Sequence, residues 1–170
     1  MKVKEVMTAK ALRSCSPESK LQEAAKSMKA GNCGVLPVTD NNKKVVGIIT
    51  DRDICLSLSQ ENTKTHADIH VSEVMGKNVH TVKENDDVTV ALKQMRTNHV
   101  GRLPVVDESG KLKGILSLHN LMSQSFDVQA SKAEDISGQY ETVLKTLKAL
   151  SGRYSKSESN KTENLLSHVL

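Results

Sequence analysis

Two long stretches of this chain carry nearly the same sequence, and this duplication constrains the fold more than any other feature. A shift of 67 positions aligns Leu21–Ile54 with Val88–Leu121, and 11 of the 34 aligned residues are identical. Upstream, a shift of 68 aligns Val3–Met7 with Val71–Met75. A unit of this length is marginal as an independent domain and too long for a solenoid repeat. The duplication therefore predicts two similar halves packed about a pseudo-two-fold axis.

Each half carries the same order of predicted elements, β-α-β-β-α, which places the chain in the α/β (α+β) class. In the first half we expect a strand over Leu12–Ser16, a helix from about Pro17 to Gly31, strands over Val35–Thr39 and Lys44–Thr50, and a helix directly after Thr50. In the second half we expect a strand over Val79–Lys83, a helix from about Asn85 to Asn98, strands over Arg102–Val106 and Lys111–Ser117, and a helix directly after Ser117.

The composition divides the chain into repeat 1 over residues 1–60, a polar linker over 61–70, repeat 2 over 71–126 and a tail over 127–170. Apolar residues at helical spacing predict a tail helix from about Ala133 to Leu150. A flexible segment over Ser151–Lys161 and a short helix over Glu163–Leu170, capped by Thr162, should follow. We expect these helices to pack on their own domain or on a sister subunit, with a dedicated partner-binding tail as the alternative.

Composition also excludes several classes of function. The formal net charge is only +4, and the chain has three aromatic residues, none of them in the aligned stretches, so a nucleic-acid platform is not expected. No stretch approaches the ~18 apolar residues of a membrane span, and the opening residues lack a signal-peptide pattern, so we expect a cytoplasmic protein. Cys15, Cys33 and Cys55 are odd in number and lack metal-ligand spacing, which predicts reduced, partly buried thiols.

A short motif closes each copy, Gly-x-x-Thr-x-x-Asp at Gly47 and Gly-x-x-Ser-x-x-Asn at Gly114. A hydroxyl at the start of a helix, beside unpaired backbone N–H groups, favours a bound phosphate. Asp53 lies three residues after Thr50, and Asn120 lies three residues after Ser117. Each is therefore on the same helical face as the hydroxyl and can accept hydrogen bonds from ribose hydroxyls. The alternative is a capping box, in which the two side chains bond only to each other and to their own backbone.

Neighbouring basic residues add weaker indications. Arg52 and Arg102 are candidates for phosphate contact, and His119 takes the place of Arg52 in the second copy. His66 and His70 are four residues apart and could share a helical face, but only Asp68 lies beside them, so we expect no metal site. No catalytic triad, nucleophile elbow, phosphate-binding loop or dinucleotide fingerprint is found, which predicts that the chain is not an enzyme.

The duplicated β-α-β-β-α order, the two Leu-Pro-Val-x-Asp strands and the two closing motifs together resemble a tandem pair of cystathionine-β-synthase (CBS) domains. This resemblance implies two clefts between the halves that bind AMP, ADP, ATP, S-adenosylmethionine or NAD as regulatory ligands, with no obligatory cofactor. It implies that Thr50 and Asp53 hold phosphate and ribose in one cleft, and Ser117 and Asn120 in the other. For the adenine it implies contacts with Leu12, Arg13, Val35, Leu36, Pro37, His80, Thr81, Leu103 and Pro104.

The resemblance also implies a homodimer and a regulated protein partner of unknown identity. Because a neutral amide binds a ribose less strongly than a carboxylate does, we expect the Asn120 cleft to be weaker or empty. The leading hypothesis is a non-catalytic sensor whose adenosine ligand shifts the arrangement of the halves. The alternatives are a dimeric scaffold with inert clefts and a small metal-assisted enzyme that uses His66 and His70.

Overall fold

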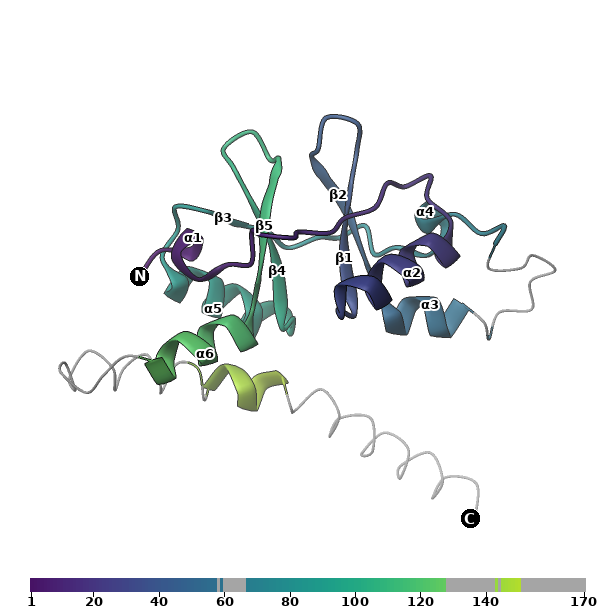
Figure 1. Ribbon diagram of the computed structural model, residues 1–170. Helices are drawn as coiled ribbons and strands as arrows, with labels where there is room; N and C mark the ends of the chain where they lie inside the picture. The colour runs from purple at the N-terminus through teal and green to yellow at the C-terminus, as the bar shows by residue number, and fades with distance from the viewer. Residues whose placement is uncertain (58, 60–66, 128–142, 144, 151–170) are drawn as a thin grey trace, which may run out of the picture.

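The computed structural model describes residues 1–57, 59, 67–127, 143 and 145–150 of the chain. Figure 1 shows two similar halves side by side, each with a β-hairpin and helices along one side of it. The first half contains α2 (Leu21–Gly31), β1 (Val35–Thr39), β2 (Val45–Thr50) and α3 (Asp51–Ser57). The second contains β3 (Val82–Lys83), α5 (Val88–Asn98), β4 (Arg102–Val106), β5 (Leu112–Ser117) and α6 (Leu118–Asp127). Two short helices, α1 (Val3–Val6) and α4 (Val71–Val74), complete the described elements.

The two hairpins confirm the prediction from the duplication, because they have the same register. Pro37 pairs with Ile48 in the first half and Pro104 pairs with Ile115 in the second, both in antiparallel strands. Each hairpin also has its register shift at the equivalent place, after Val38 or Val105. The two hairpin tips hydrogen-bond to each other across the halves, through Leu112 N donating to Lys43 O at 2.9 Å and Val45 N donating to Gly110 O at 3.3 Å.

The helices α2 and α5 form as the apolar spacing predicts. Both bury one stripe against their own hairpin, which in α2 consists of Leu21, Ala24 and Met28. Each helix ends on a residue with a left-handed backbone, Asn32 at φ 45° and His99 at φ 53°. Asparagine tolerates this conformation comparatively well, and the turn leads the chain directly into the following strand.

The prediction for the first strand of each copy is wrong in its extent. Within Leu12–Ser16, only Cys15 pairs, in an isolated parallel bridge to Val38. In the second copy the predicted strand over Val79–Lys83 shortens to β3, which pairs in parallel with β4. In the first copy, the left-handed backbone of Ala11, at φ 55°, and the missing N–H of Pro17 both limit extended pairing on either side of Cys15.

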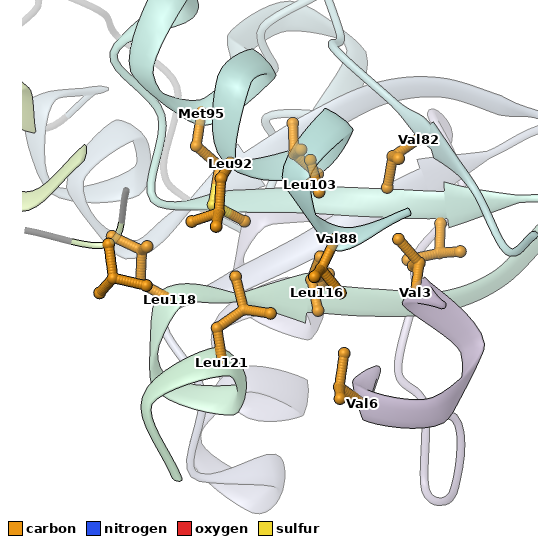
Figure 2. Packing of buried hydrophobic residues seen from close by; sticks show 13 residues of the cluster. Val3, Val6, Val82, Val88, Leu92, Met95, Leu103, Leu116, Leu118 and Leu121 are labelled. Atoms are coloured by element: carbon orange, nitrogen blue, oxygen red, sulfur yellow. The ribbon is translucent and has the colours of Figure 1, made fainter. Parts of the chain in front are cut away.

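The short helix α1 lies in the core of the second half, although it belongs to the first copy of the repeat. Val3 N donates to Asp86 O at 3.0 Å, and Lys4 N donates to Glu84 O at 2.9 Å. Val3 is fully buried and Val6 is nearly so. Figure 2 shows both side chains among Val82, Val88 and residues of α5, β4 and β5. The second core therefore contains chain from both ends of the duplication.

The helix α4 makes the reciprocal exchange. Val71 is fully buried in the first core, and its N–H donates to Ser19 O at 2.8 Å. Ile69, at the end of the predicted linker, is also buried there, and its carbonyl accepts from Leu21 N at 3.0 Å. Each core is thus built from one copy together with the short helix of the other copy. The boundaries of the packed halves therefore differ from the boundaries of the sequence repeats.

Gly47 and Gly114 provide the space for this exchange. A Cβ atom on Gly47 would overlap Sδ of Met75, and one on Gly114 would lie 2.7 Å from Sδ of Met7 and 2.9 Å from the carbonyl oxygen of Thr8. Both methionines directly follow an exchanged helix. The glycine in each closing motif therefore leaves room for a methionine side chain from the exchanged segment, which passes close to the strand.

Part of the predicted tail helix is described, and it packs on the second half. Residues 143 and 145–150 are helical, whereas the rest of the predicted tail lies outside the described residues. Val143, Leu147 and Leu150 contact the second core. His99 Nδ1 lies 3.3 Å from the carbonyl oxygen of Ala149, which ties the helix to the loop before β4. In the part of the chain that the structure describes, no helix is long and apolar enough to cross a bilayer.

Candidate functional site

A cavity of about 400 Å³ lies where the two halves meet, a size within the usual range for small-molecule sites. Three parts of the chain form it: the segment after α1, the loop from α2 into β1, and the ends of β4 and β5 with the start of α6. Its lining consists of Thr8, Ala11, Leu12, Arg13, Gly31, Asn32, Cys33, Gly34, Val35, Pro37, Arg102, Ile115, Ser117, His119 and Asn120. Both copies of the repeat are needed to build it.

The alternation of side chains along the strands decides which residues reach the cavity. On β1, Val35 and Pro37 line the cavity, whereas Leu36 and Val38 point into the first core and are fully buried. On β5, Ile115 and Ser117 line it, whereas Leu116 is fully buried in the second core. These strands thus present apolar side chains to the cavity on one face and hold the cores together with the other.

The closing motif of the second copy lies in the cavity wall. Ser117 Oγ donates to Asn120 Oδ1 at 2.6 Å, and Ser117 N donates to the same oxygen at 2.9 Å. Asn120 N donates back to Ser117 Oγ at 3.2 Å. The amide nitrogen of the Asn120 side chain donates to Thr8 Oγ1 at 3.1 Å, in the segment that follows the exchanged helix α1. The side chain of Asn120 is therefore held by both copies, at the start of α6.

The closing motif of the first copy has the same bonds. Thr50 Oγ1 and Thr50 N donate to Asp53 Oδ2 at 2.7 and 2.9 Å, and Asp53 N donates to Thr50 Oγ1 at 3.1 Å. The capping box, the alternative to a ligand site, is therefore formed in both copies. Among the described residues, the second oxygen of the Asp53 carboxylate has no hydrogen-bond partner. Both residues are partly exposed, and neither lines the cavity described above.

The predicted ligand-binding residues divide into two groups in the structure. Eight of them line the cavity: Leu12, Arg13, Val35, Pro37, Arg102, Ser117, His119 and Asn120. The other eight lie elsewhere: Thr50, Arg52, Asp53, Leu36, His80, Thr81, Leu103 and Pro104. Leu36 and Leu103 are fully buried in the two cores. The cavity therefore adjoins the motif that ends in Asn120, the one for which the sequence predicts weaker binding.

Several lining residues were not predicted, namely Thr8, Ala11, Gly31, Asn32, Cys33, Gly34 and Ile115. Ile115 lies two positions before Ser117, so the period of a strand could have indicated it. The loop from Gly31 to Gly34 directly precedes Val35, and its two glycines are a signal for close approach. No local signal indicates Thr8, because its position depends on the exchange of α1.

The three cysteines differ in their surroundings. Burial raises the pKa of the Cys15 thiol from 9.0 to about 11, and Cys33 is partly buried beside the cavity. Cys55, in contrast, is exposed on α3, so the prediction of a partly buried thiol is wrong for this residue. An exposed thiol on a helix with little apolar cover has no core to pack against. Since Cys15 remains protonated at neutral pH, it acts as a small apolar side chain.

The histidine pair considered for a metal can be assessed only in part. His70 Nδ1 lies 2.8 Å from the carbonyl oxygen of Glu18, and His70 Nε2 lies 3.0 Å from Nζ of Lys20. Both ring nitrogens thus have partners that tie α4 to the first half. His66 lies outside the described residues. Within the described ranges, no group of three His, Cys, Asp or Glu side chains is arranged to hold a metal ion.

Both copies of the repeat match a known protein family, and similar sequences occur in other proteins. The family described as "CBS domain" matches residues 3–60 and 71–127. An uncharacterised 17.7 kDa protein of Acidianus ambivalens is 38% identical over 81% of this chain and 83% of its own length. An inosine-5'-monophosphate dehydrogenase of Methanocaldococcus jannaschii is 35% identical over 76% of this chain, but this chain spans only 24% of the dehydrogenase.

Solved structures of the same fold carry adenosine ligands. The CBS domain pair of protein MJ0100, in complex with 5'-methylthioadenosine and S-adenosyl-L-methionine, covers 76% of this chain and 98% of its own at 29% identity and a TM-score of 0.65. The structure of CBSX2 in complex with AMP covers 75% and 97% at 25% identity and a TM-score of 0.64. Both ligands of the first structure and the ligand of the second contain adenosine.

Proposed function

This chain belongs to the CBS domain family, and from that premise we propose that it is a non-catalytic regulatory module. Its ligand is an adenosine-containing molecule, bound in the cavity between the two halves. The observation that carries this proposal is the composition of the cavity wall, which both copies build and which combines apolar strand residues with polar groups at the start of α6. The adenosine ligands of the two solved CBS structures described above support the same class of ligand.

The cavity suits the two chemically different ends of such a ligand. Leu12, Val35, Pro37 and Ile115 offer apolar contact to the adenine ring, which matters because no Phe, Tyr or Trp lines the cavity. Ser117, on the same face of β5 as Ile115, and Asn120, in the first turn of α6, offer hydroxyl and amide groups that can hydrogen-bond to a ribose. These polar groups already bond to one another, so ribose binding must exchange or share those bonds.

Binding at the junction provides a physical route to regulation. A ligand that contacts both halves stabilises the arrangement of the halves in which all its contacts are made. A protein partner or a second subunit that recognises one arrangement would then bind with a different affinity when the cavity is occupied. The size of the effect cannot exceed the difference in ligand affinity between the two arrangements.

A thermal-shift titration tests this function directly. Adding AMP, ATP, 5'-methylthioadenosine or S-adenosylmethionine should raise the melting temperature in a saturable way, because a ligand that binds only the folded chain stabilises it. The variant Cys33→Trp, which places a large ring in the cavity wall, should abolish the shift. Cys55→Trp, at an exposed position outside the cavity, is the matched control and should retain it.

Mass spectrometry of small molecules released from the purified, denatured protein complements the titration. A co-purified adenosine compound in the wild type and the Cys55→Trp variant, but not in Cys33→Trp, would support the proposal. No shift with any of the four ligands and no released compound would contradict it.

The formed capping boxes favour a second candidate, a scaffold with inert clefts. In both copies the hydroxyl and an oxygen of its acidic or amide partner form a capping box at the start of a helix, which a purely structural role would also explain. The scaffold predicts that Cys33→Trp and the wild type behave alike in every ligand assay. The titration above therefore separates the two functions.

A further inference from the structure

The cavity contains basic side chains and no acidic ones. Among its fifteen lining residues, Arg13 and Arg102 carry positive charge, His119 offers ring nitrogens, and no aspartate or glutamate is present. Both arginines are exposed, and within the described ranges neither guanidinium takes part in an ion pair or a hydrogen bond. Two unpaired guanidinium groups at the mouth of one cavity produce a positive potential that attracts an anionic ligand.

Gly31 determines where the Arg13 side chain lies. A Cβ atom on Gly31 would be 2.5 Å from Cδ and 2.7 Å from Nε of Arg13, distances that real contacts do not reach. The arginine therefore crosses the last residue of α2 at a position that only a residue without a side chain allows. A cation is also stabilised at the carboxyl end of a helix by the helix dipole. Gly31 is thus a positioning residue for one of the two charges.

The closing motif in the cavity lining is neutral, which distinguishes it from the motif of the first copy. Asn120 stands where the first copy has Asp53, and its side-chain amide donates to Thr8 Oγ1. A carboxylate at this point would repel a phosphate and attract a sulfonium or ammonium group. The neutral amide does neither, so Arg13 and Arg102 are the charged residues of the lining, and the nearby carboxylate of Asp51 packs against Gly34.

From these observations we infer that the cavity selects adenosine ligands with phosphate groups over neutral 5'-methylthioadenosine and over S-adenosylmethionine, whose sulfonium and ammonium groups make it a net cation. This inference rests on the proposed function, because it concerns the same site. The expected contacts are charge-assisted hydrogen bonds from the guanidinium groups to phosphate oxygens, the geometry at which arginine excels. The phosphate itself carries about −1.5 to −2 charges at neutral pH.

Isothermal titration of the full chain with adenosine, AMP and S-adenosylmethionine measures the selection. Wild type should bind AMP more tightly than adenosine by roughly ten- to a hundredfold, the usual strength of a charged hydrogen bond. S-adenosylmethionine should bind no more tightly than adenosine. Raising the salt concentration should weaken AMP binding and leave adenosine binding nearly unchanged.

Two variants identify the groups responsible. Arg13→Ala should reduce the preference for AMP over adenosine to within a few-fold. Gly31→Ala keeps both arginines but forces the Arg13 side chain to move, so it should reduce the same ratio. Because alanine is the better helix former, Gly31→Ala should leave the melting temperature equal or slightly higher, which excludes a loss through unfolding. Lys26→Ala removes an exposed charge of α2 outside the cavity and should leave the ratio unchanged.

The inference would be overturned if S-adenosylmethionine bound more tightly than AMP, or if the ratio of AMP to adenosine affinity were the same in wild type, Arg13→Ala and Gly31→Ala. These results leave the proposed function standing, because adenosine itself would still bind. If no adenosine compound bound at all, the proposed function would fail first. The two failures are therefore distinguishable in one set of titrations.

Discussion

The two glycines that admit the exchanged methionines should differ in their tolerance of alanine. At Gly47 the three atoms nearest an added Cβ all belong to the side chain of Met75, which is flexible and can turn away. At Gly114 the added Cβ meets Met7 and also the carbonyl oxygen of Thr8, at 2.9 Å. That carbonyl accepts a hydrogen bond from Ile115 N at 3.0 Å, so it cannot move without breaking the contact between the exchanged segment and β5.

The magnitudes follow from the atoms involved. Overpacking a core costs about 1 to 3 kcal/mol, and the flexible neighbour places Gly47→Ala near the lower limit, at about 1 kcal/mol. The fixed backbone neighbour places Gly114→Ala near the upper limit, at about 3 kcal/mol. Removing the methionine side chain should relieve the first clash but not the second. The double variant Gly47→Ala/Met75→Ala should therefore cost about 1 kcal/mol less than the sum of its single changes.

Urea unfolding followed by circular dichroism gives the required free energies, and it suits a chain that has no tryptophan. The double variant Gly114→Ala/Met7→Ala serves as the comparison, because the clash with Thr8 persists in it. Equal destabilisation by Gly47→Ala and Gly114→Ala would refute the reasoning. Strict additivity in the Gly47 and Met75 pair would refute it as well, since it would mean that the two side chains do not compete for the same space.

Four further predictions concern the caps, the tail and the thiols. Thr50→Ala should lower the free energy of unfolding by about 1 kcal/mol through loss of the cap of α3. Thr50→Ser keeps the capping hydroxyl and should retain most of the wild-type stability, and urea titration measures both. Leu147→Asp should cost about 2 kcal/mol by placing a charge against the second core, visible as a lower melting temperature. Alkylation mapped by mass spectrometry at pH 8 should modify Cys55 well before Cys15. Because the raised pKa of Cys15 favours the protonated folded thiol, its contribution to stability should be lost as pH rises from 9.0 towards about 11, measured by unfolding at each pH.

Local patterns were sufficient for the elements that each copy forms by itself. The repeated pattern predicted a helix from about Pro17 to Gly31 and strands over Val35–Thr39 and Lys44–Thr50, and the structure contains α2, β1 and β2 at these places. The helices α1 and α4 were not predicted, since four residues are too few to show a helical period. Their positions depend on contacts between distant parts of the chain, such as Val3 with Asp86, which a reading of local periodicity cannot provide.

The same distinction applies to the candidate site. The closing motifs of the two copies have matching hydrogen bonds, so nothing local distinguishes Ser117 from Thr50. In the structure, the two motifs differ in the segments that lie beside them. Those neighbours are set by the packing of the two halves. Strand alternation would have removed Leu36 from the expected set, because its neighbours Val35 and Pro37 share the opposite face.

The reciprocal placement of α1 and α4 also determines how this module can be cut or transplanted. A fragment that ends before residue 71 would leave a vacant groove at Gly47, and one that begins at residue 71 would leave another at Gly114. Fusion to an enzyme or a transporter must therefore carry the whole stretch from Met1 through α6, with new junctions at its outer ends. A split of the duplication at its midpoint would therefore yield two incomplete cores.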